Sequence, residues 1–146
     1  MQDIDKEQTK HKNVGAVVGD FEYLTEKRCR LIEKAAQISG FLYVFITENK
    51  KEKFADEFNS LSEQCRKYSK VRVMPSACFT ISDEKPAHNF SPAADARFFG
   101  REIAPRLSIE KRYVYEELRD TFEGRRNEGL RDVLWDYGIA LVEISR

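Results

Sequence analysis

The chain has 146 residues, of which 41% are hydrophobic and 34% are charged, a composition typical of one globular domain rather than of a disordered segment. Its 25 basic residues balance 25 acidic ones, which argues against an electrostatic nucleic-acid partner. No apolar run approaches the roughly 20 residues that a membrane-spanning helix needs, so we expect no membrane partner either.

The first elements predict a strand followed by a helix. Residues 1–12 are polar and are expected to form a flexible lead-in to a domain that covers 13–146. The run NVGAVV (13–18) lacks polar alternation, which is typical of a strand buried on both faces. Thr25 stands where a helix N-cap is expected, and that helix should end at Ser39-Gly40 with Ile38 on its inner side.

A second strand, a helix and a third strand follow. FLYVFI (41–46) is again a continuous apolar run, and VRVMP (71–75) predicts the third strand. Between them, apolar side chains recur at spacings of four, three, four and three, which is a helical stripe. Its members are Phe54, Phe58, Leu61, Cys65 and Tyr68.

The last third predicts two more helices and two more strands. Residues 76–93 form an irregular stretch, and so long a loop in a compact domain is often functional. A helix is expected over 94–104, with Phe98, Phe99 and Ile103 inward. Strands are expected over 111–116 and 139–144. The segment 126–138 between them predicts a helix with Leu130, Val133, Leu134 and Tyr137 inward and with Trp135 in packing contacts.

This alternation of strands and helices predicts an α/β fold with a doubly wound, parallel, five-stranded sheet. Such sheets bind ligands at the carboxyl ends of their strands, where the strand order reverses. After the first strand, that place is the segment 19–28, where a helix N-terminus offers free N–H groups to an anion. Lys27 and Arg28 add positive charge there and Glu26 opposes it, so a solvated first turn is the plain alternative.

Residue usage also bears on location and metals. The opening segment has no apolar signal region. The three cysteines (Cys29, Cys65 and Cys78) show no CxxC spacing, which indicates free thiols in a reducing compartment. We therefore expect a cytoplasmic protein. The two histidines, His11 and His88, lie far apart in the sequence, so no protein-built metal site is expected.

Three segments resemble one family in order and spacing. GAVVGDFEYLTEKRCRLIEKAA (15–36) resembles the first strand, loop and helix of citrate lyase ligase, a nucleotidyltransferase with a (T/H)xGH motif. RFFGREIAPRLSIEKRYVYEE (97–117) is similar to the family's stretch around IAP and GEEP, and Asn127 falls where the family has a YN pair. YGIALVEISR (137–146) resembles the family's YGIEVVEIPR.

The resemblance implies a Rossmann-like nucleotidyltransferase fold with strand order 3-2-1-4-5. It implies that ATP and Mg²⁺ convert acetate to acetyl-adenylate, and that the acetyl group then passes to the prosthetic thiol of the citrate lyase acyl carrier subunit. Thr25 and Arg28 take the catalytic positions of the motif. The expected nucleotide contacts are Gly15, Asp20, Thr25, Lys27 and Arg28, and His88, Glu116 and Glu117 are weaker candidates on the substrate side.

Several of these residues have plainer interpretations. Asp20 is able to hold Mg²⁺ through water or simply to form an Asx-turn. Glu116 and Glu117 end the fourth strand and suit either a substrate or solvent. His88 has no catalytic partner near it in sequence, which favours a surface histidine.

The motif itself is altered, because Lys27 replaces its Gly and Arg28 replaces its His. Glycine lets phosphate approach the backbone, and the histidine donates to the α-phosphate.

The first hypothesis for the function is the ligase reaction, active or impaired. The alternative is an inactive module that binds a nucleotide or a partner and needs no cofactor. A relative of the cytidylyltransferases is a third, weaker option. Arg146 stands just before the family's phosphate-contacting ISxxxxR-like segment, which leaves a truncated domain open.

Overall fold

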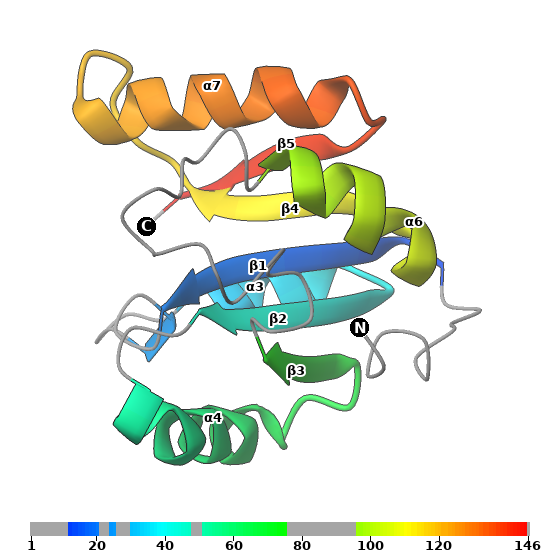
Figure 1. The fold of residues 1–146 in the computed structure, drawn as a ribbon, viewed down its shortest axis with the longest axis vertical. Helices are drawn as coiled ribbons and strands as arrows, with labels where there is room; N and C mark the ends of the chain where they lie inside the picture. Colours follow the sequence, from blue (N-terminus) through cyan, green and yellow to red (C-terminus); the bar gives the residue numbers. More distant parts are fainter. Residues whose placement is uncertain (1–11, 21–23, 26–29, 48–50, 76–95, 146) are drawn as a thin grey trace.

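The computed structural model describes residues 12–20, 24–25, 30–47, 51–75 and 96–145. Figure 1 shows their arrangement. The described helices and strands are β1 (Val14–Asp20), α3 (Arg30–Ile38), β2 (Phe41–Thr47), α4 (Lys51–Cys65), β3 (Val71–Pro75), the π-helical turn η3 (Phe99–Ile103), α6 (Ala104–Leu107), β4 (Ile109–Tyr115), α7 (Phe122–Trp135) and β5 (Ala140–Ile144).

All five strands form one parallel sheet in the order β3-β2-β1-β4-β5, which confirms the predicted fold and strand order. The predicted strand bounds agree to within two residues, and the third strand, 71–75, matches at both ends. The continuous apolar runs predicted the strands correctly because helices cover both faces of the sheet. Side chains on both faces are therefore buried and apolar. The predicted lead-in lies outside the described residues, apart from Lys12.

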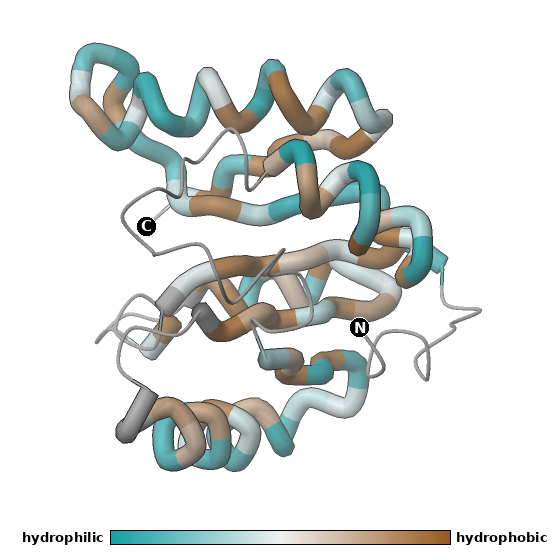
Figure 2. Tube along the Cα trace, viewed as in Figure 1, coloured by the Kyte–Doolittle hydropathy of each residue, from teal (hydrophilic) through white to brown (hydrophobic). Residues whose placement is uncertain are grey.

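Two apolar clusters lie on opposite faces of the sheet. Figure 1 shows α3 behind the sheet and α6 in front of it, and Figure 2 shows hydrophobic residues along the strands. One packs the sheet against α3 and α4 and includes Val17, Leu31, Ile32, Leu42 and Leu61. The other packs it against η3, α6 and α7 and includes Ala16, Phe45, Phe99, Ile103 and Leu134. The predicted helical stripe is confirmed over 54–65, because Leu61 and Cys65 are buried and Phe54 and Phe58 pack against the first cluster. Tyr68 packs against the same cluster but lies past the end of α4.

The predicted inner position of Ile38 is wrong, because its side chain is 52% exposed. Helix α3 buries Leu31, Ile32, Ala35 and Ala36. These four residues form one apolar stripe, whose centre lies between Ile32 and Ala35. Ile38 lies at the edge of that stripe and in the last turn. The helix ends there, where the Asn13 side-chain amide donates to the Ile38 carbonyl at 3.0 Å.

The helix predicted over 94–104 is helical from 96 to 107 and contains the π turn η3. Its predicted inward residues Phe98, Phe99 and Ile103 are buried. A Cβ on Gly100 would lie 2.6 Å from Cγ of Tyr137, so only glycine lets this turn pack so closely against that ring. The Tyr137 ring thus packs on Gly100, but its predicted inward position is only partly correct, since Tyr137 is 38% exposed.

Helix α7 begins at Phe122, four residues before the predicted start at 126. Thr121 is its N-cap, and the Thr121 hydroxyl accepts from the Gly124 N–H at 3.0 Å. The predicted packing role of Trp135 is wrong, since its side chain is 72% exposed. It is the neighbour of the fully buried Leu134, and adjacent helical residues point in directions about 100° apart.

Candidate functional site

The first feature of the site is the separation of β1 and β4, the two strands at which the order of the sheet reverses. Their pairing joins Val14 to Ile109, Gly15 to Lys111 and Ala16 to Arg112, and among the described residues it goes no further. Residues 17–20 of β1 continue to pair with β2, and β4 continues to pair with β5. The carboxyl halves of β1 and β4 are thus not joined to each other, which is the place where doubly wound sheets take their ligands.

Two of the predicted nucleotide contacts lie on β1 and just after it. Asp20 is the last residue of β1 and pairs with Thr47 of β2, so its backbone is at the carboxyl edge as predicted. Thr25 has helical backbone and is half-buried beside Leu24, which is 1% exposed and belongs to the cluster around α3. Thr25 thus lies after β1 as predicted, but the predicted N-cap position is wrong, because an N-cap residue has non-helical backbone and Leu24 before it is already helical. Lys27, Arg28 and His88 lie outside the described residues, as do Cys29 and Cys78.

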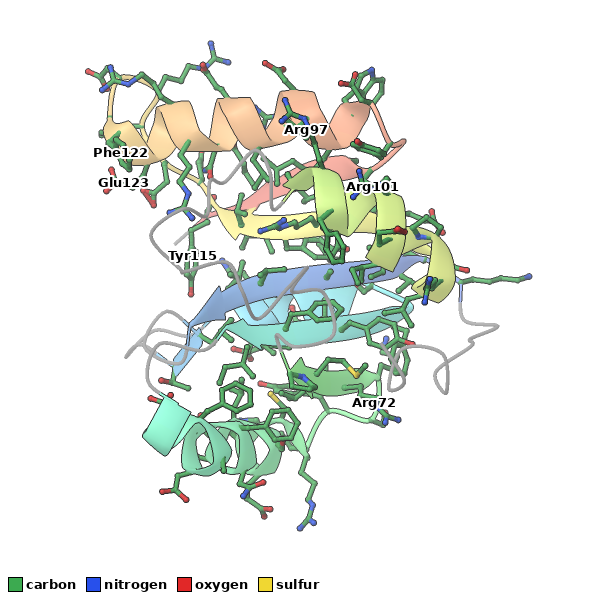
Figure 3. The ribbon with its side chains drawn as sticks, in the orientation of Figure 1. Arg72, Arg97, Arg101, Tyr115, Phe122 and Glu123 are labelled. Carbon is green, nitrogen blue, oxygen red and sulfur yellow. The ribbon has the colours of Figure 1, made fainter. Side chains whose placement is uncertain are left out.

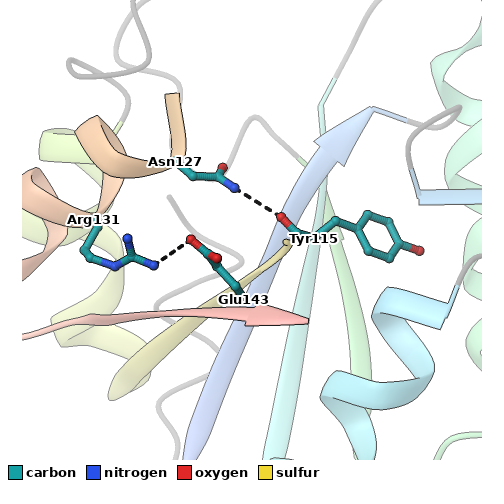
Figure 4. Close-up of polar contacts among 4 residues, drawn as sticks. All are labelled: Tyr115, Asn127, Arg131 and Glu143. Atoms are coloured by element: carbon teal, nitrogen blue, oxygen red, sulfur yellow. Dashed lines mark hydrogen bonds and ion pairs between the residues drawn. The ribbon is translucent and has the colours of Figure 1, made fainter. Parts of the chain in front are cut away.

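Tyr115, the last residue of β4, connects this edge to two helices (Figure 3). Its side chain is 3% exposed, and its hydroxyl accepts from the Leu31 N–H at 3.1 Å. Leu31 belongs to α3, so the Tyr115 hydroxyl joins the end of β4 to that helix. Figure 4 shows the second connection, in which the Asn127 side-chain amide donates to the Tyr115 carbonyl at 3.1 Å.

The two glutamates that follow β4 lie at the same edge. Glu116 is exposed; its N–H donates to the Ile144 carbonyl at 2.8 Å, and its carboxylate accepts from the Ser145 hydroxyl at 3.2 Å. Glu117 is half-buried. Lys34 of α3 donates to the Ser145 carbonyl at 3.0 Å. The predicted substrate-side glutamates are thus at the carboxyl edge, on the side of β4 that adjoins β5.

Gly15 is placed differently from the other predicted contacts. It is the second residue of the seven in β1 and pairs with the β4 segment far from the carboxyl edge. A Cβ there would overlap Cε2 of Tyr113 and lie 3.0 Å from the Ser39 hydroxyl oxygen. The Tyr113 ring therefore passes directly over the backbone of β1, and packing accounts for the glycine.

Arg112 is a further charged residue near the point of separation, and sequence reasoning did not single it out. It is 7% exposed and is the last β4 residue paired with β1. Its guanidinium carbon lies 5.3 Å from the centroid of the Phe99 ring, a cation–π arrangement. Because basic residues in a strand usually face solvent, nothing in KRYVYE marked this one as buried.

The described side chains suit one part of an ATP and Mg²⁺ site. Thr25 has a hydroxyl after β1, and Glu116 and Glu117 after β4 have carboxyl groups of the kind that Mg²⁺ accepts through water. The cations expected to face the phosphates, Lys27 and Arg28, lie outside the described residues. Within the described part of the chain, no three His, Cys, Asp or Glu residues form a metal-binding group. No helix there has both the length and the apolar character to span a membrane.

Solved structures of pantothenate synthetases have a similar fold. Pantoate-beta-alanine ligase (pantothenate synthetase) from Thermus thermophilus superposes with TM-scores of 0.64 and 0.60 in two crystal structures, at 10% identity in each. The enzyme from Francisella tularensis, solved with beta-gamma ATP and beta-alanine, superposes with a TM-score of 0.59 at 11% identity. Each match covers 99% of this chain but only 59%, 59% and 64% of the other protein, respectively.

The sequence comparisons are more specific. No curated protein sequence matches the chain. The family model for the citrate lyase ligase C-terminal domain matches residues 14–146, which include all five strands and the whole candidate site. The chain belongs to the citrate lyase ligase C-terminal domain family, and it has the nucleotidyltransferase fold.

Proposed function

We propose that this chain binds ATP at the carboxyl edge between β1 and β4 and carries out the citrate lyase ligase reaction. In that reaction an acetate oxygen attacks the α-phosphorus of ATP and pyrophosphate leaves. The thiolate of the prosthetic group on the acyl carrier subunit then attacks the acetyl carbonyl, and AMP leaves. The observation that carries the proposal is the separation of β1 and β4 beyond Ala16 in a chain of this family.

The residues of this chain would act by holding and orienting the reactants, because the attack needs no protein nucleophile. The Thr25 hydroxyl would donate to a phosphate beyond the end of β1. Arg28 takes the place of the motif's histidine and would donate to the α-phosphate, where negative charge grows in the transition state. Asp20 and Glu116 would hold the waters of a bound Mg²⁺.

Titration of the protein with Mg·ATP tests the proposal. We expect saturable binding, with Thr25→Val weakening it by removing the hydroxyl at nearly constant volume. Acetate-dependent release of pyrophosphate then measures adenylation. Absence of binding at millimolar ATP would refute the proposal. Acetylation of the purified acyl carrier subunit tests whether that subunit is the partner. The proposal also includes a cytoplasmic location.

A second candidate is a module that binds nucleotide without turning it over. Lys27 and Arg28 in the motif favour it, because the loss of one preorganised donor typically lowers a rate by about a hundred- to a thousandfold. Binding of Mg·ATP without pyrophosphate release would support this candidate and exclude the active ligase.

Restoring the motif separates the two candidates further. If the altered motif limits catalysis, Lys27→Gly with Arg28→His raises pyrophosphate release or ATP affinity. The matched control is Lys67→Gly with Arg66→His, which changes an exposed basic pair between α4 and β3 in the same way. An equal effect of both double variants would show that the motif position has no special role.

A further inference from the structure

Helix α3 is connected to β4 by two buried tyrosine hydroxyls, one at Leu31 and one just past the carboxyl end of the helix. At Leu31, the Tyr115 hydroxyl accepts from the backbone N–H at 3.1 Å. Just past the carboxyl end, the Ser39 hydroxyl donates to the Tyr113 hydroxyl at 2.8 Å. Both tyrosines are at most 3% exposed and belong to the same apolar cluster. They are therefore closely matched in burial and in the element to which they link β4.

The two bonds lie at different distances from the candidate site. Tyr113 lies over Gly15, where β1 and β4 are still paired. Tyr115 lies at the carboxyl end, where they are not. Without a ladder of backbone hydrogen bonds between β1 and β4 there, the bond to Leu31 ties β4 to the helix that follows β1. The Asn127 amide holds the Tyr115 backbone from the other side, at 3.1 Å (Figure 4).

We infer that Tyr115 is a positioning residue for ATP: its hydroxyl holds α3 in place against β4 at Leu31, so that the nucleotide meets both at a set separation. This inference rests on the proposed function. The hydroxyl touches neither the nucleotide nor the reacting atoms in this account, and it acts through Leu31 and α3. Because a buried neutral hydrogen bond contributes modestly, its removal is expected to change affinity several-fold rather than abolish binding.

The test compares Tyr115→Phe with Tyr113→Phe, which removes a matched buried hydroxyl away from the edge. Titration with Mg·ATP should show affinity about three- to tenfold weaker for Tyr115→Phe and unchanged for Tyr113→Phe. Both variants should unfold at lowered and similar temperatures, so stability alone would not separate them. Exchange of the Leu31 amide hydrogen, followed by NMR, should become faster only in Tyr115→Phe.

The outcomes that overturn the inference are distinct. Equal ATP affinity in both variants and the unchanged protein would refute the positioning role while leaving the proposed function in place. Tighter binding by Tyr115→Phe would also refute it, because it would mean that the hydroxyl competes with the nucleotide for the Leu31 amide. Unchanged exchange at Leu31 would show that the bond does not hold the helix. No ATP binding by the unchanged protein would refute the proposed function, and the positioning role with it.

Discussion

Replacing Gly15 by alanine is expected to destabilise the protein by overpacking. The added Cβ would overlap the Tyr113 ring at Cε2, lie 3.1 Å from its Cδ2 and lie 3.0 Å from the Ser39 hydroxyl oxygen. Carbon atoms pack best at about 3.5–4.0 Å, so the ring must shift within a fully buried site. Overpacking of this kind lowers the free energy of unfolding by about 1–3 kcal/mol, which lowers the Tm of a chain of this size by about 3–10 °C.

The matched control for this prediction is the same substitution at Gly129, on the exposed face of α7. A Cβ there meets nothing within 4 Å. Because alanine favours a helix over glycine, Gly129→Ala should raise the free energy of unfolding by up to about 1 kcal/mol. Thermal unfolding followed by circular dichroism measures both variants. The two identical substitutions should thus have opposite signs.

A double variant and a nucleotide titration complete the test. Replacing Tyr113 by leucine removes the ring atoms that the new methyl group meets, so Gly15→Ala should cost less stability in that background. ATP affinity, measured well below the Tm, should change little. The packing account would be refuted if Gly15→Ala kept the original Tm and lost ATP binding, since that result would make Gly15 a nucleotide contact.

Three further predictions concern α7 and β5. Thr121→Ala should lower the free energy of unfolding by about 1 kcal/mol and Thr121→Ser by much less, by chemical denaturation, because only serine keeps an acceptor for the Gly124 N–H. Arg131→Ala, which removes the 2.6 Å bond to a Glu143 carboxylate, should lower the Tm only slightly at low salt and hardly at all in molar salt, since this pair is partly exposed. Trp135→Ser should change the free energy of unfolding by at most about 0.5 kcal/mol, and a larger loss would show that the exposed ring makes a stabilising contact.

The strands were predictable because their physical signal is local. In FLYVFI, five of the six side chains are buried and the sixth is half-buried, as expected for a central strand covered on both faces. The start of α7 was less visible, since Gly124 stands three residues after the cap and masks the helical pattern. The π turn was not predicted from its own residues, and the close packing of its Gly100 on Tyr137 joins segments that lie far apart in the sequence.

The candidate site was predictable in part. The carboxyl end of β1 follows from a buried apolar run succeeded by a helical segment. The cap was not predicted correctly, because Leu24 and Thr25 are both already helical. The role of Tyr115 was not visible, because its hydroxyl meets an amide 84 residues earlier in the chain. A tyrosine at the end of a strand indicates packing, and sequence alone does not show which helix its hydroxyl reaches.

The packing at Gly15 also bears on why the carboxyl halves of β1 and β4 separate. Without a side chain at Gly15, the Tyr113 ring lies on the backbone of β1, which lets the amino halves of the two strands pair. The register shifts between Val14 and Gly15, and pairing stops after Ala16. Because β1 and β4 are paired only in their amino halves, another interaction has to hold the carboxyl end of β4 in place. The hydrogen bond between Tyr115 and Leu31 does this by joining β4 to α3. By this argument Gly15 acts on the paired half of β1 and β4, and Tyr115 acts on the separated half. Gly15→Ala should therefore lower stability and leave the nucleotide edge largely unchanged.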